Sequence, residues 1–175
     1  ISGDKINYML ELRASNNDIV KPYAEKYGVE FFEGRRPWEV KCDIAMPCAT
    51  QNELNEEDAR MLVKNGVKVV CEGANMPCTP EAVTVFHENK IPFGPGKAAN
   101  AGGVATSGLE MSQNGMKLMW SAEEVEERLR QIMVNIHANC VKYGTEPNGY
   151  VNHVKGANIA GFIKVADAMI DQGVI

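Results

Sequence analysis

The first half of the chain alternates short apolar runs with segments that carry helix signals. Residues 67–71 are nearly continuous in β-branched apolar side chains, which is typical of a strand buried on both faces of a sheet. Residues 43–46 and 91–93 form shorter apolar runs, and residues 29–32 form another after the glycine at Gly28. Short strands that alternate with helices of about ten residues predict βαβ units and a parallel sheet.

Capping residues predict a helix on each side of the 67–71 strand. Asn55 is followed by three acidic residues, which favour the positive end of the helix dipole, and this helix ends at Asn65. Thr79 caps the second helix with Pro80 at its first position, and that helix ends near Lys90. The alternation therefore predicts the α/β class.

The pattern changes after residue 93. Residues 94–103 are rich in glycine and precede a helix predicted over residues 104–118. Ser121 and Glu124 have the spacing of a capping box, and the helix that follows has apolar residues at 3.6-residue intervals. A last apolar helix is predicted from about Tyr150. The chain thus ends in a helical extension.

Composition excludes several classes of protein. Of the 175 residues, 45% are hydrophobic and 23% are charged, which excludes a disordered chain, a collagen-like chain and a small disulfide scaffold. The net charge is −5 and no basic block occurs, so we expect neither nucleic acid nor a membrane as a partner. The five cysteines lack CxxC spacing, and we expect free, buried thiols in a cytoplasmic protein.

Three unusual loops follow the predicted strands. They cover residues 47–52, 72–77 and 94–103, and each combines small residues with an amide or a hydroxyl. Turn formation alone explains any one of them. In an open parallel sheet, however, ligands bind at the carboxyl ends of the strands, and all three loops are expected there. Together they predict a ligand-binding groove.

Catalytic and metal-binding patterns are weak. His137 and Cys140 lie one helical turn apart, but no second pair completes a metal site. Residues 94–99 match the G-x-G-x-x-G/A string, yet no acidic residue ends a strand about 20 positions later, as ribose recognition requires. Ser107 is either a small helix residue or, near a helix N-terminus, a contact for a carboxylate. The residues indicate binding without catalysis, and no metal.

The chain resembles the hexameric glutamate dehydrogenases throughout its length, and particularly the bacterial and fungal type that uses NADP. The resemblance is carried by four stretches: residues 42–54, 71–82, 94–114 and 154–162. It implies the carboxyl-terminal part of such an enzyme. Residues 1–118 would form an incomplete Rossmann-like nucleotide-binding domain that lacks its first βαβ portion, and residues 119–175 a C-terminal helical extension.

The resemblance also implies cofactor contacts at matching positions. Ala49, Thr50 and Gln51 resemble residues that pack along the ribose and nicotinamide of the cofactor. Asn75 resembles the amide that faces the nicotinamide ribose, and Asn100 the asparagine that binds the nicotinamide carboxamide. The implied cofactor is NADP, with NAD as the other candidate.

Ser107 resembles the serine that holds the γ-carboxylate of glutamate. The implied reaction of the whole enzyme is the reversible oxidative deamination of L-glutamate to 2-oxoglutarate and ammonia. The family's catalytic lysines and aspartate belong to an amino-terminal domain, so we expect no turnover by this chain alone. The family is hexameric, and we expect a dimer or a monomer with exposed apolar helix faces for this piece.

Two alternatives remain open from the sequence. The chain could be a non-catalytic α/β module that binds a nucleotide or a protein. It could also come from a leucine- or phenylalanine-type amino acid dehydrogenase, because these enzymes are related. They lack a hydroxyl at the Ser107 position, however, so Ser107 favours glutamate.

Overall fold

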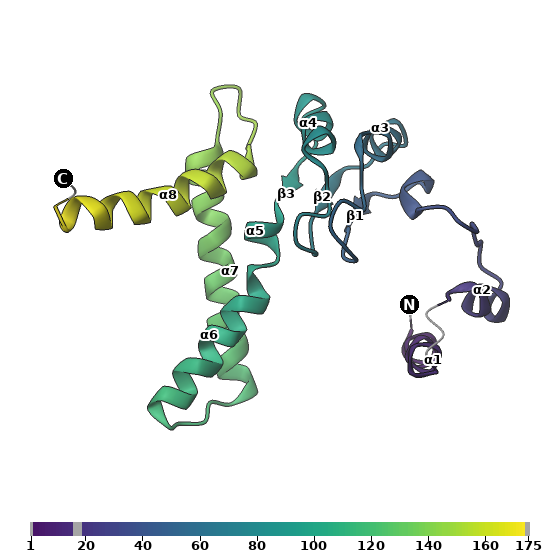
Figure 1. Cartoon of the computed structure of the whole chain (residues 1–175), viewed down its shortest axis with the longest axis horizontal. Helices are drawn as coiled ribbons and strands as arrows, with labels where there is room; N and C mark the ends of the chain where they lie inside the picture. Colours follow the sequence, from purple (N-terminus) through teal and green to yellow (C-terminus); the bar gives the residue numbers. More distant parts are fainter. Residues whose placement is uncertain (1, 16–18, 174–175) are drawn as a thin grey trace. The chain divides into compact units, whose positions relative to one another are not determined.

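Contacts divide the chain into two units, Ile1–Pro37 and Trp38–Ile175, in a computed structural model that describes residues 2–15 and 19–173 (Figure 1). The first unit holds helices α1 (Gly3–Ala14) and α2 (Lys21–Tyr27). Their contact is aromatic: the rings of Tyr8 and Tyr27 meet edge to face with centroids 5.8 Å apart. Neither helix was singled out from the sequence.

The strand predicted over residues 29–32 is wrong. The segment has no strand or helix assignment, and its side chains Val29, Phe31 and Phe32 are exposed. A parallel strand needs a neighbour to satisfy its backbone N–H and C=O groups. In the described part of the chain no strand pairs with this one, so apolar character alone does not make it a strand.

The second unit contains a sheet followed by a chain of helices. After the short 3₁₀ helix η1 (Pro37–Glu39), the elements follow in this order: β1 (Ile44–Ala45), α3 (Glu56–Lys64), β2 (Val69–Cys71), α4 (Pro80–Glu88), β3 (Phe93–Gly94), α5 (Gly96–Ala99), α6 (Ala101–Met116), α7 (Ala122–Gly144) and α8 (His153–Asp171).

The sheet is parallel, with the three strands side by side in chain order. Ile44 lies opposite Val69, and Val70 lies opposite Phe93. Helices α3 and α4, which connect the strands, pack against each other. These observations confirm the predicted α/β class and the parallel sheet with C-terminal helices.

The predicted capping residues act as expected. Asn55 and Asp58 form a capping box at the start of α3, with both hydrogen bonds at 3.0 Å. The Thr79 hydroxyl accepts the N–H of Ala82 at the start of α4. Side-chain caps supply partners for N–H groups that a helix end leaves unpaired, which is why these residue types can be read from sequence.

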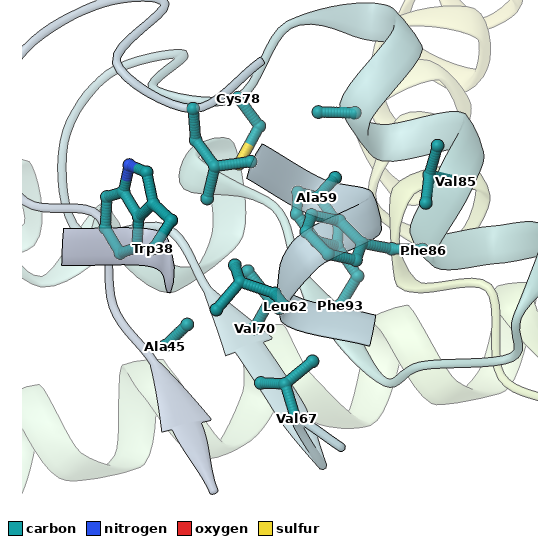
Figure 2. Close-up of a cluster of buried hydrophobic side chains, with 12 residues drawn as sticks. Trp38, Ala45, Ala59, Leu62, Val67, Val70, Cys78, Val85, Phe86 and Phe93 are labelled. Atoms are coloured by element: carbon teal, nitrogen blue, oxygen red, sulfur yellow. The ribbon is translucent and has the colours of Figure 1, made fainter. Parts of the chain in front are cut away.

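The core lies between the sheet and the two connecting helices (Figure 2). Leu62 of α3 and Phe86 of α4 are fully buried, together with Val70 and Phe93 of the sheet. The rings of Phe86 and Phe93 stack with centroids 5.7 Å apart. Burying each such side chain contributes about 1.5–3 kcal/mol, so this core holds the strands in place.

The glycine-rich stretch is more helical than predicted. Within residues 94–103 the short helix α5 forms, because the Pro95 carbonyl accepts the N–H groups of Ala98 and Ala99. Helix α6 then begins at Ala101 and not near residue 104. Ser107 is consequently the seventh residue of α6, and its expected place at a helix N-terminus is wrong.

Helices α7 and α8 cross at a close backbone contact. A Cβ atom added at Gly156 of α8 would overlap the carbonyl group of Cys140 in α7. Beyond this crossing four large apolar side chains of α8 are exposed: Phe162 (69% exposed), Val165, Met169 and Ile170. This confirms the expected exposed face on the last helix.

The five cysteines are free, as predicted, but they are not all buried. Cys78 and Cys140 are buried, whereas Cys48 is exposed. In the described residues, no helix has both the length and the apolar character needed to span a membrane.

Candidate functional site

The three loops predicted to bind a ligand follow the carboxyl ends of β1, β2 and β3. Because the strands are parallel, these ends meet at one edge of the sheet. Hydrogen bonds join each loop to the next. The structure therefore brings the loops together as the sequence predicted.

Backbone hydrogen bonds join the first loop to the second. The Pro47 carbonyl accepts the N–H of Gly73 at 2.9 Å, and the Met76 carbonyl accepts the N–H of Asn52 at 3.0 Å. A Cβ at Gly73 would overlap the Cys48 sulfur, so the loops approach too closely for a side chain there.

An asparagine pair joins the second loop to the third. The Nδ2 of Asn100 donates to the Oδ1 of Asn75 at 2.7 Å and to the carbonyl of Ala74 at 3.1 Å. A backbone carbonyl only accepts, so the atom of Asn100 that faces Ala74 must be the nitrogen. Its neighbour on Asn75 must then be the oxygen, and one hydrogen-bond network fixes both amides.

This network leaves one donor group and one acceptor group available. The Nδ2 of Asn75 and the Oδ1 of Asn100 have no hydrogen-bond partner among the described residues, and Asn75 is exposed. A ligand that offers an acceptor beside a donor, such as a sugar hydroxyl next to a carboxamide, matches this pair.

Ala49, Thr50 and Gln51 lie in the first loop and are exposed. The carboxylate of Glu53 accepts the N–H of Ala49 at 2.8 Å and that of Thr50 at 3.4 Å. These bonds hold the loop backbone from within. The three side chains remain exposed to solvent.

Ser107 stands apart from the asparagine pair. It is exposed on α6, and its hydroxyl donates to the Gly103 carbonyl at 3.4 Å. Seven residues of helix separate it from Asn100, a rise of roughly 10 Å. Gly103 is the last residue of the third loop, and no hydrogen bond in the described residues joins Ser107 to the first or second loop or to Asn100.

Glu72 was missed from the sequence as a site residue. Its carboxylate is buried and accepts the N–H of Cys78 at 3.2 Å and the N–H of Gly96 at 2.6 Å. Burial, with the nearby Glu72 charge, raises the pKa of the Cys78 thiol. An acidic residue directly after a buried strand, between Cys71 and Gly73, was the available signal.

A cavity of about 570 Å³ adjoins this edge. Asn75, Glu72 and Gly96 line it together with apolar side chains of α4 and β3. Among the described residues, no group of three His, Cys, Asp or Glu side chains is arranged to hold a metal ion.

Comparison with known proteins decides the family. The family model of glutamate/leucine/phenylalanine/valine dehydrogenases matches residues 2–173. The chain belongs to this dehydrogenase family.

Relatives in the family are similar over the whole of this chain. The NAD-specific glutamate dehydrogenase of Bacteroides fragilis is 68% identical over 100% of the chain and 40% of its own length. The NADP-specific glutamate dehydrogenase of Haemophilus influenzae is 58% identical over 98% of the chain and 38% of its own length. The chain therefore spans about 40% of the length of each of these two dehydrogenases.

The fold is also that of the family. A solved glutamate dehydrogenase structure superimposes with a TM-score of 0.92 and 49% identity, covering 99% of this chain and 39% of that one. This agrees with the resemblance carried by residues 42–54, 71–82, 94–114 and 154–162, and with a piece of a larger dehydrogenase.

Proposed function

We propose that this chain forms the nicotinamide-binding edge of a glutamate dehydrogenase. The whole enzyme would oxidise L-glutamate with NAD(P)⁺ and water, giving 2-oxoglutarate, ammonia as the ammonium ion, NAD(P)H and a proton. The observation that carries the proposal is the Asn75–Asn100 pair at the carboxyl edge of the sheet, in a chain 68% identical to a glutamate dehydrogenase.

The available amide atoms suit a nicotinamide nucleoside. The Oδ1 of Asn100 would accept a hydrogen bond from the carboxamide NH₂, and the Nδ2 of Asn75 would donate to the adjacent ribose. Ala49, Thr50 and Gln51 would line the same nucleoside from the first loop. When bound, the dinucleotide supplies the hydride acceptor, and these residues would orient its ring toward the substrate.

Ser107 is the proposed contact for the substrate. Its hydroxyl would donate to the γ-carboxylate of glutamate, which the apolar substrates leucine and phenylalanine lack. The exposure of Ser107 on α6 supports this role, because a ligand can reach the hydroxyl. The proposal places residues 1–118 in the nucleotide-binding domain and residues 119–175 in a helical extension.

The resemblance favours NADP, whereas the relative with 68% identity is NAD-specific, so both cofactors belong in the test. We further propose a cytoplasmic location, since the five cysteines are free, and a homo-oligomer, a hexamer in the whole enzyme. The chain alone would bind cofactor weakly and would not turn over glutamate.

A chimaera tests the proposed function. The part of the Bacteroides fragilis relative that this chain does not match is joined to the chain. Glutamate-dependent reduction of NADP⁺ and NAD⁺ is then measured, with leucine and phenylalanine as comparison substrates. We expect glutamate to be the preferred substrate. A folded chimaera that is inactive with glutamate, beside an active B. fragilis parent, would contradict the proposal.

A further inference from the structure

A buried carboxylate connects the second and third loops of the site at a second point, apart from the asparagine pair. Glu72 is only 6% exposed. Burying a charged carboxylate is unfavourable unless hydrogen bonds replace its water. At Glu72 they do, since each carboxylate oxygen accepts one backbone N–H.

The two N–H groups come from opposite sides of the site. Cys78 ends the turn that contains Asn75, and Gly96 begins α5, the helix that ends at Asn100. The bond to Gly96 is 2.6 Å long, shorter than the usual distance of about 2.9–3.0 Å between the nitrogen and oxygen of an N–H···O bond. Glu72 therefore fixes the start of α5, and the asparagine pair forms at its end.

Packing around Gly96 leaves little space between α5 and the 72–78 turn. A Cβ added at Gly96 would lie 3.0 Å from the Ala74 carbonyl oxygen and 3.3 Å from the Glu72 carboxylate. The same Ala74 carbonyl accepts from Asn100 and fixes the orientation of its amide. A shift of Gly96 relative to Glu72 would thus change the position of the Ala74 carbonyl relative to the Asn100 amide that it orients.

We propose that Glu72 is a positioning residue of the nicotinamide site, holding α5 against the 72–78 turn so that Asn75 and Asn100 keep one amide orientation. This inference rests on the proposed function, because it assigns the pair to the cofactor. Both carboxylate oxygens of Glu72 already accept backbone N–H groups, so we assign it no ligand contact: it would act through the backbone of Cys78 and Gly96.

The test uses the active chimaera and two cofactors. One is the natural dinucleotide, and the other carries 3-acetylpyridine in place of nicotinamide, which removes the NH₂ donor that Asn100 would accept from. Glu72→Gln keeps the shape of the side chain but turns one acceptor into a donor, which then faces an N–H group. We expect kcat/KM for the natural cofactor to fall about tenfold, as for the loss of one hydrogen bond.

The decisive readout is discrimination between the two cofactors. Glu72→Gln should lower the preference for the natural cofactor toward that of Asn100→Ala, and the double variant should show no further loss. Leu62→Ala is the stability control: it loosens the buried core below the sheet and should leave the discrimination unchanged. Glu57→Gln, an exposed acid on α3, is the charge control.

Wild-type discrimination in Glu72→Gln would overturn the inference while leaving the proposed function intact. Inactivity of the unsubstituted chimaera with glutamate would instead count against the proposed function. Where Glu72→Gln does not fold, Gly96→Ala is the second variant, because its added methyl group disturbs the same Glu72–Gly96 hydrogen bond from the α5 side. It should lower the discrimination in the same direction, and an unchanged value there would also overturn the inference.

Discussion

The Nδ2 of Asn100 lies 2.7 Å from the Oδ1 of Asn75 and 3.1 Å from the Ala74 carbonyl oxygen, so two acceptors share one amide nitrogen. This relationship gives the pair opposite polarities toward a ligand: a donor on Asn75 and an acceptor on Asn100. The polarity is set before any ligand binds, which lowers the cost of ordering the site on binding.

Replacing Asn100 by aspartate should disrupt the pair more than removing its side chain. The new carboxylate oxygen would face two acceptors, the Ala74 carbonyl and the Asn75 Oδ1. We expect kcat/KM for the cofactor in the chimaera to fall by about tenfold or more, measured by steady-state kinetics. Asn135→Asp is the control, since the exposed Asn135 accepts from Gln131 and a carboxylate can do the same. Equal effects of the two substitutions would argue against the assigned polarity.

Ser107→Val should affect the substrate and spare the cofactor. The hydroxyl that would donate to the γ-carboxylate is lost, so we expect kcat/KM for glutamate to fall about tenfold or more while the KM for the cofactor stays nearly constant. Ser112→Val is matched to it, because Ser112 lies on the same helix and its hydroxyl also donates to a backbone carbonyl one turn earlier. Undiminished glutamate turnover in Ser107→Val would point to a sister amino acid dehydrogenase.

Gly156→Ala should weaken the crossing of α7 and α8. The added methyl group overlaps the Cys140 carbonyl, and backbone cannot rotate away as a side chain can. We expect the free energy of unfolding, measured by urea denaturation of the chain, to fall by about 1–3 kcal/mol. Gly161→Ala on the same helix meets nothing within 4 Å and should raise it by about 0.5–1 kcal/mol. A neutral result for Gly156→Ala would mean that the helices separate easily.

His87 should make stability depend on pH. Its Nε2 is buried without a hydrogen-bond partner, and burial lowers its pKa, with Glu146 acting weakly in the opposite direction. The unfolded chain, in which the histidine pKa is about 6.5, then binds more protons than the folded chain near pH 6. The uncharged His87 side chain therefore makes its full contribution to the free energy of unfolding above about pH 6.5. That contribution is lost as the pH falls below this value.

His87→Phe tests this contribution. The substituted ring can keep the edge-on contacts with Phe93 and Tyr150. We expect the variant to lose less unfolding free energy than the unsubstituted chain between about pH 7.5 and 5.5, measured by urea titration. Identical losses in the two proteins would show that His87 is not responsible.

Local signals in the sequence predicted those parts of the fold that depend on local chemistry. Asn55 begins α3, as the acidic residues after it indicate, and Ser121 forms the capping box that its spacing from Glu124 indicates. The run at residues 67–71 supplies the strand β2 at Val69–Cys71, because β1 and β3 lie on either side of it; residues 67 and 68 precede the strand. Residues 29–32 have the same apolar character, but no strand lies beside them in the described residues. Whether a strand has a neighbour depends on distant parts of the chain, so a short apolar run cannot predict it.

The site was predicted only in part for a similar reason. The edge of the sheet and its three loops follow from strand polarity and loop composition, whereas the resemblance singled out Asn75 and Asn100 within those loops. Their direct hydrogen bond, and the role of Glu72, depend on contacts between residues 24 to 26 positions apart. Spacing of that kind carries no periodic signal, so only the folded structure reveals which amide faces which carbonyl.

The strand order has a consequence for how the protein is made. Each strand pairs with the next one along the chain, so every new strand finds its partner already synthesised. Each pairing joins residues 23 to 25 positions apart, and domains generally fold from the amino-terminal side during synthesis. The sheet and the loop edge it carries can therefore assemble on the ribosome before α7 and α8 have emerged.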